Sequence, residues 1–467
     1  MGSLTSGSVV KTFFRHLFMG FGSALVLSLY SVVDAIMVGR YEGEDGMAAV
    51  ATIVPIWTIA LSIGLLFGIG GATRIASALG AKKEEKARGY FTVTIILLLA
   101  VSVLAWLVLL FFDRQLLSYF GAEGPTLELA LLYVRPIKWV LPLVIFAQAL
   151  TSFVRNDGSP LYASLAVIIG GITNIVFDYL LVFVFNLGIY GAGIATAGSE
   201  SLTCLLLLIR LFFFPKRLRF VKPKDFFYRA SDILVSGFPS FIIDAATGIV
   251  AVFMNRQIVS YFEGEEALAI YGVIGQFAFV ALSFSYAIAH ASQPLIGANL
   301  GAHRPKRVKK LLELGTASAA GLGLLFTLAA LLLPQELASL FMTDPQPDVL
   351  MAASDYILPY AGTFFFLTLN VYWAYFFIAT YNTTLSIVIS LFRSIVLPLL
   401  FIYVFPLIMP PLSLFYAMLA VEAIVSIVSA GVILFFLKKK PSRLLGTERP
   451  SVPIAAEASS EGLPPSR

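Results

Sequence analysis

Two apolar stretches each hold a single carboxylate: SLYSVVDAIMVG (residues 28–39) holds Asp34, and GGITNIVFDYLLVFVF (residues 170–185) holds Asp178. A carboxylate near the centre of a membrane span costs about 2.5–3.5 kcal/mol on insertion scales, so an acid kept there marks an ion or proton pathway. Both acids lie in the first half of the chain. The two stretches therefore predict coupled transport across a membrane.

The composition of the chain agrees with this interpretation. Of 467 residues, 59% are hydrophobic and 13% are charged, whereas soluble domains carry about 25% charged residues. Apolar runs of roughly 20 residues, enough to cross about 30 Å of hydrocarbon, recur along the chain. We predict an all-α polytopic membrane protein with twelve transmembrane helices, at residues 12–39, 47–78, 90–112, 127–153, 161–185, 190–214, 233–261, 267–299, 311–333, 349–379, 384–408 and 411–437.

The loops between these spans alternate in charge. Basic loops such as LGAKKEEKAR (79–88) alternate with acidic loops such as EGEDG (42–46). Because Lys and Arg concentrate in cytoplasmic loops, we expect a protein of the cell membrane with both termini in the cytoplasm. The same loops explain the net charge of +5 without a nucleic-acid partner. The first hydrophobic stretch is too long for a signal peptide and is interpreted as the first span.

Residues with reactive or metal-binding side chains are few. One cysteine, Cys204, and three scattered histidines give neither a disulfide framework nor a metal-binding spacing. There is no GxxxxGK[ST] motif for ATP binding. We therefore expect no metal, no cofactor and no enzymatic activity, and a monomer whose partners are the lipid bilayer and small cationic or amphipathic substrates.

The chain contains an internal repeat with an offset of 221 residues. DAIMVGRYEGEDGMAAV from Asp34 aligns without a gap with NRQIVSYFEGEEALAIY from Asn255, and the match continues to the LGA before each basic loop. An offset of six spans keeps both halves in one orientation, as in transporters whose two lobes rock about a central cavity. The predicted parts are an N-terminal lobe, a basic linker, a C-terminal lobe and a disordered tail, at residues 1–215, 216–230, 231–440 and 441–467.

The repeat also shows where the halves differ. Asp34 corresponds to Asn255, and Asp178 falls opposite Pro398 when VFDYLLVFVFN is aligned with VLPLLFIYVFP. The second half thus lacks both carboxylates at the matching positions. If a proton binds, the first lobe is the expected host.

The chain resembles the multidrug and toxic compound extrusion (MATE) family of transporters, and specifically its bacterial multidrug exporters. The segments that carry the resemblance are SLYSVVDAIMVGRYEGEDGMAAV, GIGGATRIASALGAKKEEKA, VRNDGSP, TNIVFDYLL, YGAGIAT, SGFPSFIID and ASQPLIGANLGA. The resemblance implies two six-helix lobes around a central cleft and efflux of drugs or cations by antiport with H⁺ or Na⁺. It also implies an ion site in the first lobe, formed by Tyr30, Asp34, Asn174, Asp178 and Thr196.

The residues themselves support this ion site. Tyr30 and Asp34 are four apart, as are Asn174 and Asp178, so each pair shares one helical face. A buried acid needs such hydrogen-bonding neighbours, and burial favours its neutral, protonated form. The alternative is a hydrogen-bonded packing cluster that exchanges no protons. Glu200, one turn beyond Thr196, either joins this cavity or is held against a neighbouring helix.

The second half offers candidates for a substrate cavity. Asp244 and Asn255 lie three turns apart on one helical face, where an acid can meet a cationic substrate. Glu422 is the repeat equivalent of Glu200, and a plain helix–helix hydrogen bond is its alternative role. Asn370 stands where related transporters would carry an acid, which argues against a second cation site. The other cavity candidates are Tyr271, Gln276, Tyr286 and His290.

Two further predictions concern the helices. Pro359 and Pro398 lie inside spans, where proline can bend a helix, so they are candidate hinges or static kinks. Arg74 lies six residues from a basic loop, so we expect its side chain to snorkel toward the membrane surface.

Two functions are consistent with the sequence. The first is a secondary antiporter that exports organic cations or drugs in exchange for H⁺ or Na⁺ by alternating access. The second is a flippase of lipid-linked precursors from the same wider superfamily, which would need buried basic residues to meet phosphates. Few buried cations and several intramembrane acids favour the antiporter.

Overall fold

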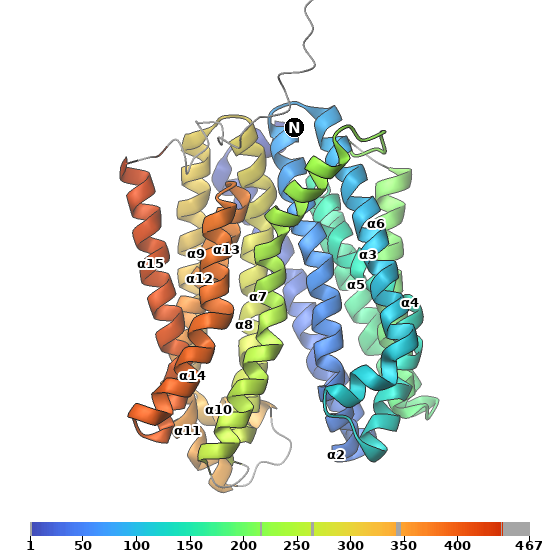
Figure 1. Cartoon of the computed structure of the whole chain (residues 1–467), viewed down its shortest axis with the longest axis vertical. Coiled ribbons are helices and arrows are strands. Elements are labelled where there is room, and N and C mark those ends of the chain that lie inside the picture. The colour runs from blue at the N-terminus through green and yellow to red at the C-terminus, as the bar shows by residue number, and fades with distance from the viewer. Residues whose placement is uncertain (1, 215–216, 263–265, 342–346, 440, 442–467) are drawn as a thin grey trace, which may run out of the picture.

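A computed structural model describes residues 2–214, 217–262, 266–341, 347–439 and 441, and this part of the chain is wholly helical (Figure 1). Twelve of its helical segments are long and apolar enough to cross a membrane, which confirms the predicted fold class. The elements are α1 (Gly2–Thr5), α2 (Val9–Gly80), α3 (Glu84–Tyr119), α4 (Gly124–Asn156), α5 (Pro160–Asp178), η1 (Tyr179–Val184), α6 (Gly188–Phe213), α7 (Phe226–Tyr261), α8 (Glu266–Gly301), α9 (Pro305–Leu332), α10 (Pro334–Phe341), α11 (Pro347–Ala361), α12 (Thr363–Ala379), α13 (Thr383–Leu391), η2 (Phe392–Val396), α14 (Leu397–Ile408), η3 (Pro411–Tyr416) and α15 (Ala417–Lys439).

Helix α2 contains the first two spans, Val9–Gly43 and Asp45–Gly80. The chain reverses at Gly43, whose φ of 68° and ψ of −146° belong to a region that only glycine adopts readily. The spans are longer than predicted because the polar loop residues 40–46 continue the two helices almost to the turn.

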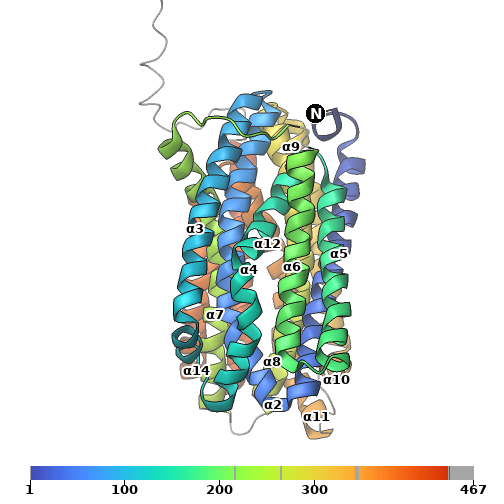
Figure 2. The same ribbon diagram turned by 90° about the vertical axis from the view of Figure 1, so that its right-hand side faces the viewer.

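The helices form two groups. In Figure 1 the helices of the first half, α2 to α6, lie on one side and α8 to α15 lie on the other, with α7 crossing in front. Figure 2, turned by 90°, brings α3 to α6 to the front. That these groups move as the two predicted lobes stays a prediction.

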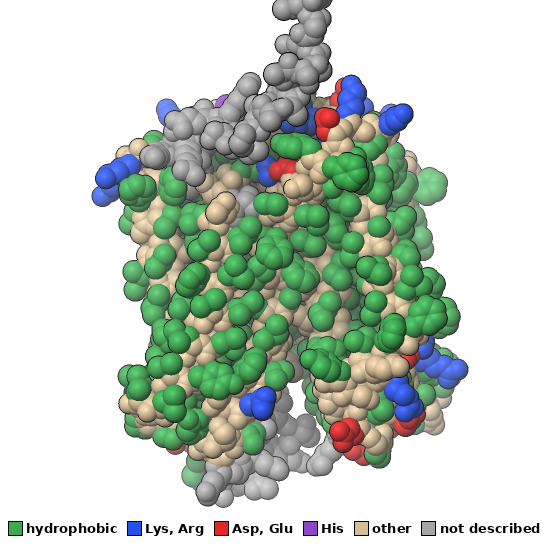
Figure 3. All heavy atoms as spheres, in the orientation of Figure 1, with side chains coloured by type: hydrophobic (Ala, Val, Ile, Leu, Met, Phe, Trp, Pro, Cys, Tyr) green, Lys and Arg blue, Asp and Glu red, His purple; other side chains and the backbone are tan. Residues whose placement is uncertain are grey.

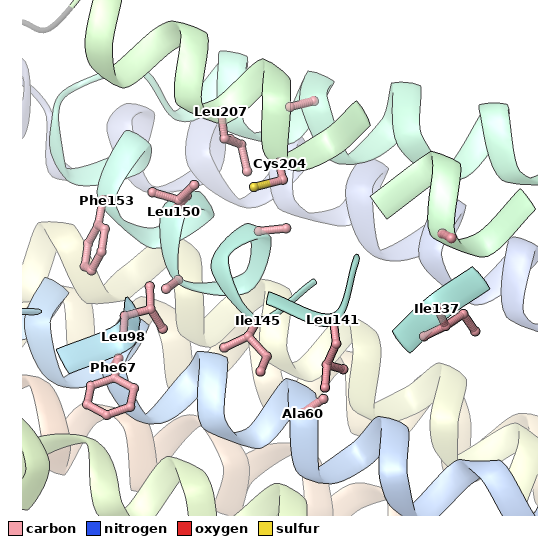
Figure 4. Packing of buried hydrophobic residues seen from close by; sticks show 14 of the residues in the cluster. Ala60, Phe67, Leu98, Ile137, Leu141, Ile145, Leu150, Phe153, Cys204 and Leu207 are labelled. Carbon is pink, nitrogen blue, oxygen red and sulfur yellow. The ribbon is translucent and has the colours of Figure 1, made fainter. Parts of the chain in front are cut away.

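The first group has its own hydrophobic core. Figure 4 shows Ile145 and Leu150 of α4 packed near Phe67 of α2 and Cys204 of α6. The single cysteine is fully buried in this core. Separate clusters fill the second group, with Phe376 and Phe377 of α12 in one and Phe364 and Phe415 in another.

The segment between the two groups docks against the first one. Arg217 and Leu218 donate their backbone N–H groups to the Asp157 carboxylate at 2.7 and 3.0 Å, and Val221 donates its own to Thr92. Helix α7 begins at Phe226, so the last residues of the predicted linker 216–230 are helical. Residues 442–467 of the predicted disordered tail lie outside the described part of the chain.

The backbone supports the internal repeat independently of side-chain identity. Lys82 and His303, 221 positions apart, both have a positive φ, of 60° and 52°. The turns around them make the same three hydrogen bonds. Gly158 and Tyr381 form a second matched pair of turns, with φ of 84° and 61°. All four turns connect spans on one side of the bundle, which we call the basic end.

The second pair of turns differs from the sequence alignment in one detail. Its offset is 223, whereas the pairing of Asp178 with Pro398 in the sequence alignment has an offset of 220. The conclusion that the second half has no matching carboxylate is unchanged.

The two halves meet at the basic end through glycines that are themselves a repeat pair. A Cβ on Gly80 would lie 2.1 Å from the Ala298 carbonyl oxygen, and a Cβ on Gly301 would lie 2.0 Å from that of Ser77. Ser77 and Ala298 are also 221 positions apart. The contact between α2 and α8 is therefore reciprocal, as a pseudo-two-fold axis along the membrane normal requires. Small residues allow this close approach of helix backbones.

This contact predicts different effects for two alanine substitutions in α8. Gly301→Ala should lower the free energy of unfolding by about 1–3 kcal/mol, because the added methyl group cannot fit against Ser77. Gly275→Ala is the matched control, since nothing lies within 4 Å of its added Cβ. It should be neutral or slightly stabilising, because alanine is the better helix former. Thermal unfolding of the purified protein in detergent measures both, and equal effects would contradict the packing described here.

Candidate functional site

A series of hydrogen-bonded polar side chains joins four helices inside the first group. The Tyr133 hydroxyl of α4 donates to Asp34 Oδ2 of α2 at 3.3 Å and lies 3.2 Å from Thr196 Oγ1 of α6. Asn174 of α5 donates from Nδ2 to the same Thr196 oxygen at 3.4 Å. These hydrogen bonds connect side chains of α2, α4, α5 and α6.

Asp178 lies beside this series of hydrogen bonds, where α5 changes its winding. The helix becomes a π-helix at Tyr179, and single π-turns within helices are frequent at functional sites. The Asp178 side chain is 0% exposed, and within the described part of the chain neither of its carboxylate oxygens has a hydrogen-bond partner. Asp178 lies near enough to Asp34 for the two charges to interact. Two carboxylates in one low-dielectric site disfavour double ionisation.

Glycines bring these helices close enough together. A Cβ on Gly170 would lie 1.9 Å from Thr203 Oγ1 of α6, and one on Gly171 would lie 2.5 Å from Val26 of α2. On the other side of α6, a Cβ on Gly193 would lie 2.3 Å from the Tyr133 carbonyl oxygen. The sequence thus places small residues one turn before Asn174 and Thr196.

The structure brings all six predicted ion-coupling residues into one region. Tyr30 packs toward α5 and lies within electrostatic range of Glu200, Asp34 and Asp178. Sequence reasoning missed Tyr133, which makes the central hydrogen bonds. The only signal for it was a phenol inside the apolar span LALLYVRPI, and that does not identify a partner 99 residues away.

The second group contains an acid surrounded by aromatic rings. Tyr286 of α8 donates to Asp244 Oδ1 of α7 at 3.0 Å. The Tyr286 ring stacks on His290 with centroids 5.9 Å apart, and Tyr375 of α12 packs against both. Asp244 Oδ2 has no hydrogen-bond partner among the described residues. Three predicted cavity residues, Asp244, Tyr286 and His290, therefore lie together, with Tyr375 as an addition.

A different pattern surrounds Glu422 of α15. Arg393, in the π-helix η2, pairs with Glu422 at 2.8 Å and donates a second bond from Nε at 2.9 Å. Asn370 donates to Glu422 Oε2 at 2.6 Å, and Ser426 donates to the Asn370 amide oxygen at 2.9 Å. Arg393 is 6% exposed and Glu422 2%. Glu422 is thus neutralised by a cation that sequence reasoning did not consider.

The remaining predicted cavity residues lie apart from these clusters. Asn255 and Gln276 are exposed, and Tyr271 packs edge-on against Phe415 with centroids 6.4 Å apart. Pro359 precedes the break between α11 and α12, and Pro398 is the second residue of α14, which follows η2. Both prolines mark irregular helix positions, and their role as hinges stays a prediction.

That Arg74 reaches the membrane surface stays a prediction. Its guanidinium pairs with Asp232 of α7 at 2.5 Å and donates to Ser236 at 3.0 Å. It also lies over the Tyr381 ring at 4.1 Å, while the Tyr90 hydroxyl donates to Asp232 at 2.7 Å. Asp232 lies 158 residues away in the sequence, so this ion pair could not be predicted from residues near Arg74. These contacts fasten α2, α3, α7 and the α12–α13 turn together at the basic end.

The two groups separate at the opposite end. Figure 3 shows the surface hollowed between them at the end away from the N-terminus. Loops with Glu42, Asp45 and Glu123 lie at that end, which we call the acidic end. In this view the surface is hollowed at the acidic end, whereas α2 and α8 are in close contact at the basic end.

Comparison with known families agrees with this architecture. The family model described as MatE matches residues 21–180 and 239–404, well over half of the chain and one segment in each repeat. The chain belongs to the MatE family. The family resemblance expected from the sequence motifs is thus confirmed.

Two named proteins are similar to this chain in sequence. The multidrug export protein MepA of Staphylococcus saprophyticus is 28% identical over 254 residues, which cover 54% of this chain and 55% of that protein. MepA of Staphylococcus aureus strain N315 is 26% identical over 327 residues, covering 68% and 71%. The chain thus spans little more than half of the first relative.

A solved structure shows the same fold. It is described as the outward-facing conformation of a multidrug resistance MATE family transporter of the MOP superfamily. It superposes with a TM-score of 0.85 at 21% identity and covers 93% of this chain and 97% of that one.

The Arg393–Glu422 pair yields a stability prediction. Arg393→Met should lower the free energy of unfolding by about 3–5 kcal/mol, because it leaves Glu422 buried without its cation. The double variant with Glu422→Leu should recover most of the loss, since no buried charge remains. Thermal unfolding in detergent measures both.

An exposed ion pair provides the control. Arg114→Gln removes the cation from the pair with Glu128, whose side chains are 58% and 64% exposed, and should cost less than about 1 kcal/mol. An Arg393→Met variant as stable as this control would show that the buried pair is not formed.

Proposed function

We propose that this MatE-family protein is a secondary antiporter that exports organic cations or drugs in exchange for H⁺, with Na⁺ as the alternative coupling ion. One observation carries the proposal: Asp178 is fully buried and Asp34 half-buried, their charges lie near enough to interact, and no basic side chain pairs with either among the described residues. Glu422, by contrast, is neutralised by Arg393. Asp34 and Asp178 therefore need a mobile cation, and Glu422 does not.

These hydrogen bonds suggest how protonation of Asp34 changes the contacts between the helices. When Asp34 is ionised, Tyr133 donates to it and can accept from Thr196. When Asp34 is protonated, its own hydroxyl can donate to Tyr133, which then donates to Thr196. Asn174 can donate to Thr196 in both cases, because Thr196 retains a free lone pair. Protonation thus reverses the direction of the bonds that join α2, α4 and α6.

Coupling then follows from differential binding. A proton entering from the acidic end stabilises one arrangement of the first-half helices, and a cationic substrate stabilises the other. Each ligand shifts the equilibrium only by its difference in affinity for the two states. Since Lys and Arg concentrate in the loops of the basic end, we assign that end and both termini to the cytoplasm and the acidic end to the outside.

Asp244 and its aromatic neighbours form the proposed substrate contact. The carboxylate supplies negative charge, and Tyr286 and Tyr375 supply ring faces that attract organic cations. The relatives named as multidrug export proteins support a broad rather than a single substrate class. We propose that the protein acts as a monomer without a cofactor.

The alternative of a lipid-linked precursor flippase rests on buried basic residues. Two such residues, Arg393 and Arg74, are paired with Glu422 and Asp232, so a phosphate would have to displace a carboxylate from either one. Arg155 has no acidic partner among the described residues, but it is a single cation, whereas Asp34, Asp178 and Asp244 are three acids without a basic partner there. The antiporter is therefore the better-supported function.

Transport in proteoliposomes tests the proposal. Purified protein should move a fluorescent organic cation such as ethidium when a pH gradient is imposed, and Asp34→Asn should reduce this proton-driven rate by tenfold or more. A sodium gradient imposed separately identifies Na⁺ coupling if it alone drives transport. Unchanged proton-driven transport by Asp34→Asn would refute the assigned role of Asp34.

Two further variants sharpen this experiment. Tyr133→Phe keeps the ring but removes the hydroxyl, so it should weaken coupling while substrate binding stays normal. Asp45→Asn changes an exposed acid of the acidic end and should have no effect. If neither gradient drives any of several cations, while a fluorescent lipid crosses the bilayer, the flippase replaces the antiporter.

A further inference from the structure

A groove at the basic end combines charge with apolar surface. It has a volume of about 480 Å³ and lies between the start of α2, the start of α5 and the end of α6. Arg15, Ser159 and Arg210 supply its polar surface. Leu161, Leu165 and Phe214 supply its apolar walls, together with Gly158, Pro160 and Tyr162. None of these residues belongs to the ion or substrate clusters.

The charge of the groove is positive and partly uncompensated. Arg210 is held in place: it pairs with Asp157 at 3.4 Å and donates to Ser159 Oγ at 2.5 Å and to the Phe214 carbonyl. Arg15 is exposed, and no acidic side chain pairs with it in the described part of the chain. One cation of the groove is therefore neutralised and fixed, and the other is free to bind an anion.

A second basic group lies directly behind the groove. A small cavity of about 10 Å³ shares Pro160 with it and is lined by His16, Arg155 and His290. His16 is 9% exposed, and its Nδ1 has no hydrogen-bond partner among the described residues. It lies within electrostatic range of both Arg15 and Arg155. Arg155 also lacks an acidic partner there, so it adds to the positive potential.

The apolar walls face the bilayer. Leu161 and Leu165 are 47% and 45% exposed and lie one turn apart on α5, below the charged rim. Each belongs to a segment that crosses the membrane. A ligand that fills the groove must therefore carry an anionic group at the membrane surface and a hydrocarbon chain running into the membrane.

We propose that this groove binds an anionic phospholipid from the leaflet at the basic end of the protein. The phosphate lies at Arg15 and Ser159, and one acyl chain lies along Leu161 and Leu165. Basic pockets between transmembrane helices on the cytoplasmic side are suited to anionic headgroups, and each Lys or Arg near the surface contributes about fivefold to the affinity. The lipid would fill the space between the first and fifth spans, which carry Asp34 and Asp178. This proposal does not depend on the transported substrate.

Lipid binding to the purified full-length protein tests this inference. Native mass spectrometry and thermal unfolding are followed while phosphatidylglycerol or phosphatidylcholine is added to the detergent micelles. We expect tighter binding and a larger rise in unfolding temperature with phosphatidylglycerol. Arg15→Gln should reduce the affinity for phosphatidylglycerol about fivefold and leave that for phosphatidylcholine unchanged.

Lys11 provides the matched control. It is an exposed cation one turn earlier on the same helix and does not line the groove. Lys11→Gln should keep the preference for phosphatidylglycerol, whereas Leu165→Gln should weaken binding of both lipids at the groove. Equal losses in Arg15→Gln and Lys11→Gln would overturn the site, because they would show general surface attraction. Equal stabilisation by inorganic phosphate alone would overturn the lipid as its ligand.

Discussion

The cost of placing a charge in hydrocarbon determines how this structure is organised. Each buried charge must find a partner, bind a mobile ion or become neutral. Glu422 takes the first solution, since it and Arg393 neutralise one another inside the bundle. Asp34, Asp178 and Asp244 do not, because among the described residues they receive at most a hydrogen bond from a neutral side chain. Buried acids within one bundle thus differ in the chemistry that they need from outside.

The shared backbone plan has a consequence of its own. Gly80 and Gly301 allow α2 and α8 to touch at the basic end, and the Arg74–Asp232 pair adds an electrostatic contact at the same end. Nothing comparable among the described residues joins the halves at the acidic end, where the surface is hollowed (Figure 3). In alternating access the closed end must open. The ion pair is then the contact with the higher cost to break, since both partners are largely buried.

The sequence predicted the features that depend on residues close together along the chain. Spans follow from runs of apolar residues, and the candidate ion site was proposed from polar residues four apart on one face. The partners of buried charges depend on distant segments and could not be predicted in this way. Arg393 and Arg74 show this, because an arginine near a span end usually reaches the membrane surface. Tyr133 shows it for a neutral residue, since a phenol in an apolar span fits packing equally well.

The first span connects these observations. Its start carries Arg15 in the lipid-facing groove, Gly20 contacts Ala287 of α8 in the other half, and Asp34 lies further along the same helix. A change in the protonation of Asp34 alters hydrogen bonds on one side of this span, and its other side is packed against the second half. Under the proposed function, this span would therefore link the protonation of Asp34 to the contact between the halves. A lipid bound at its start would contact the same span.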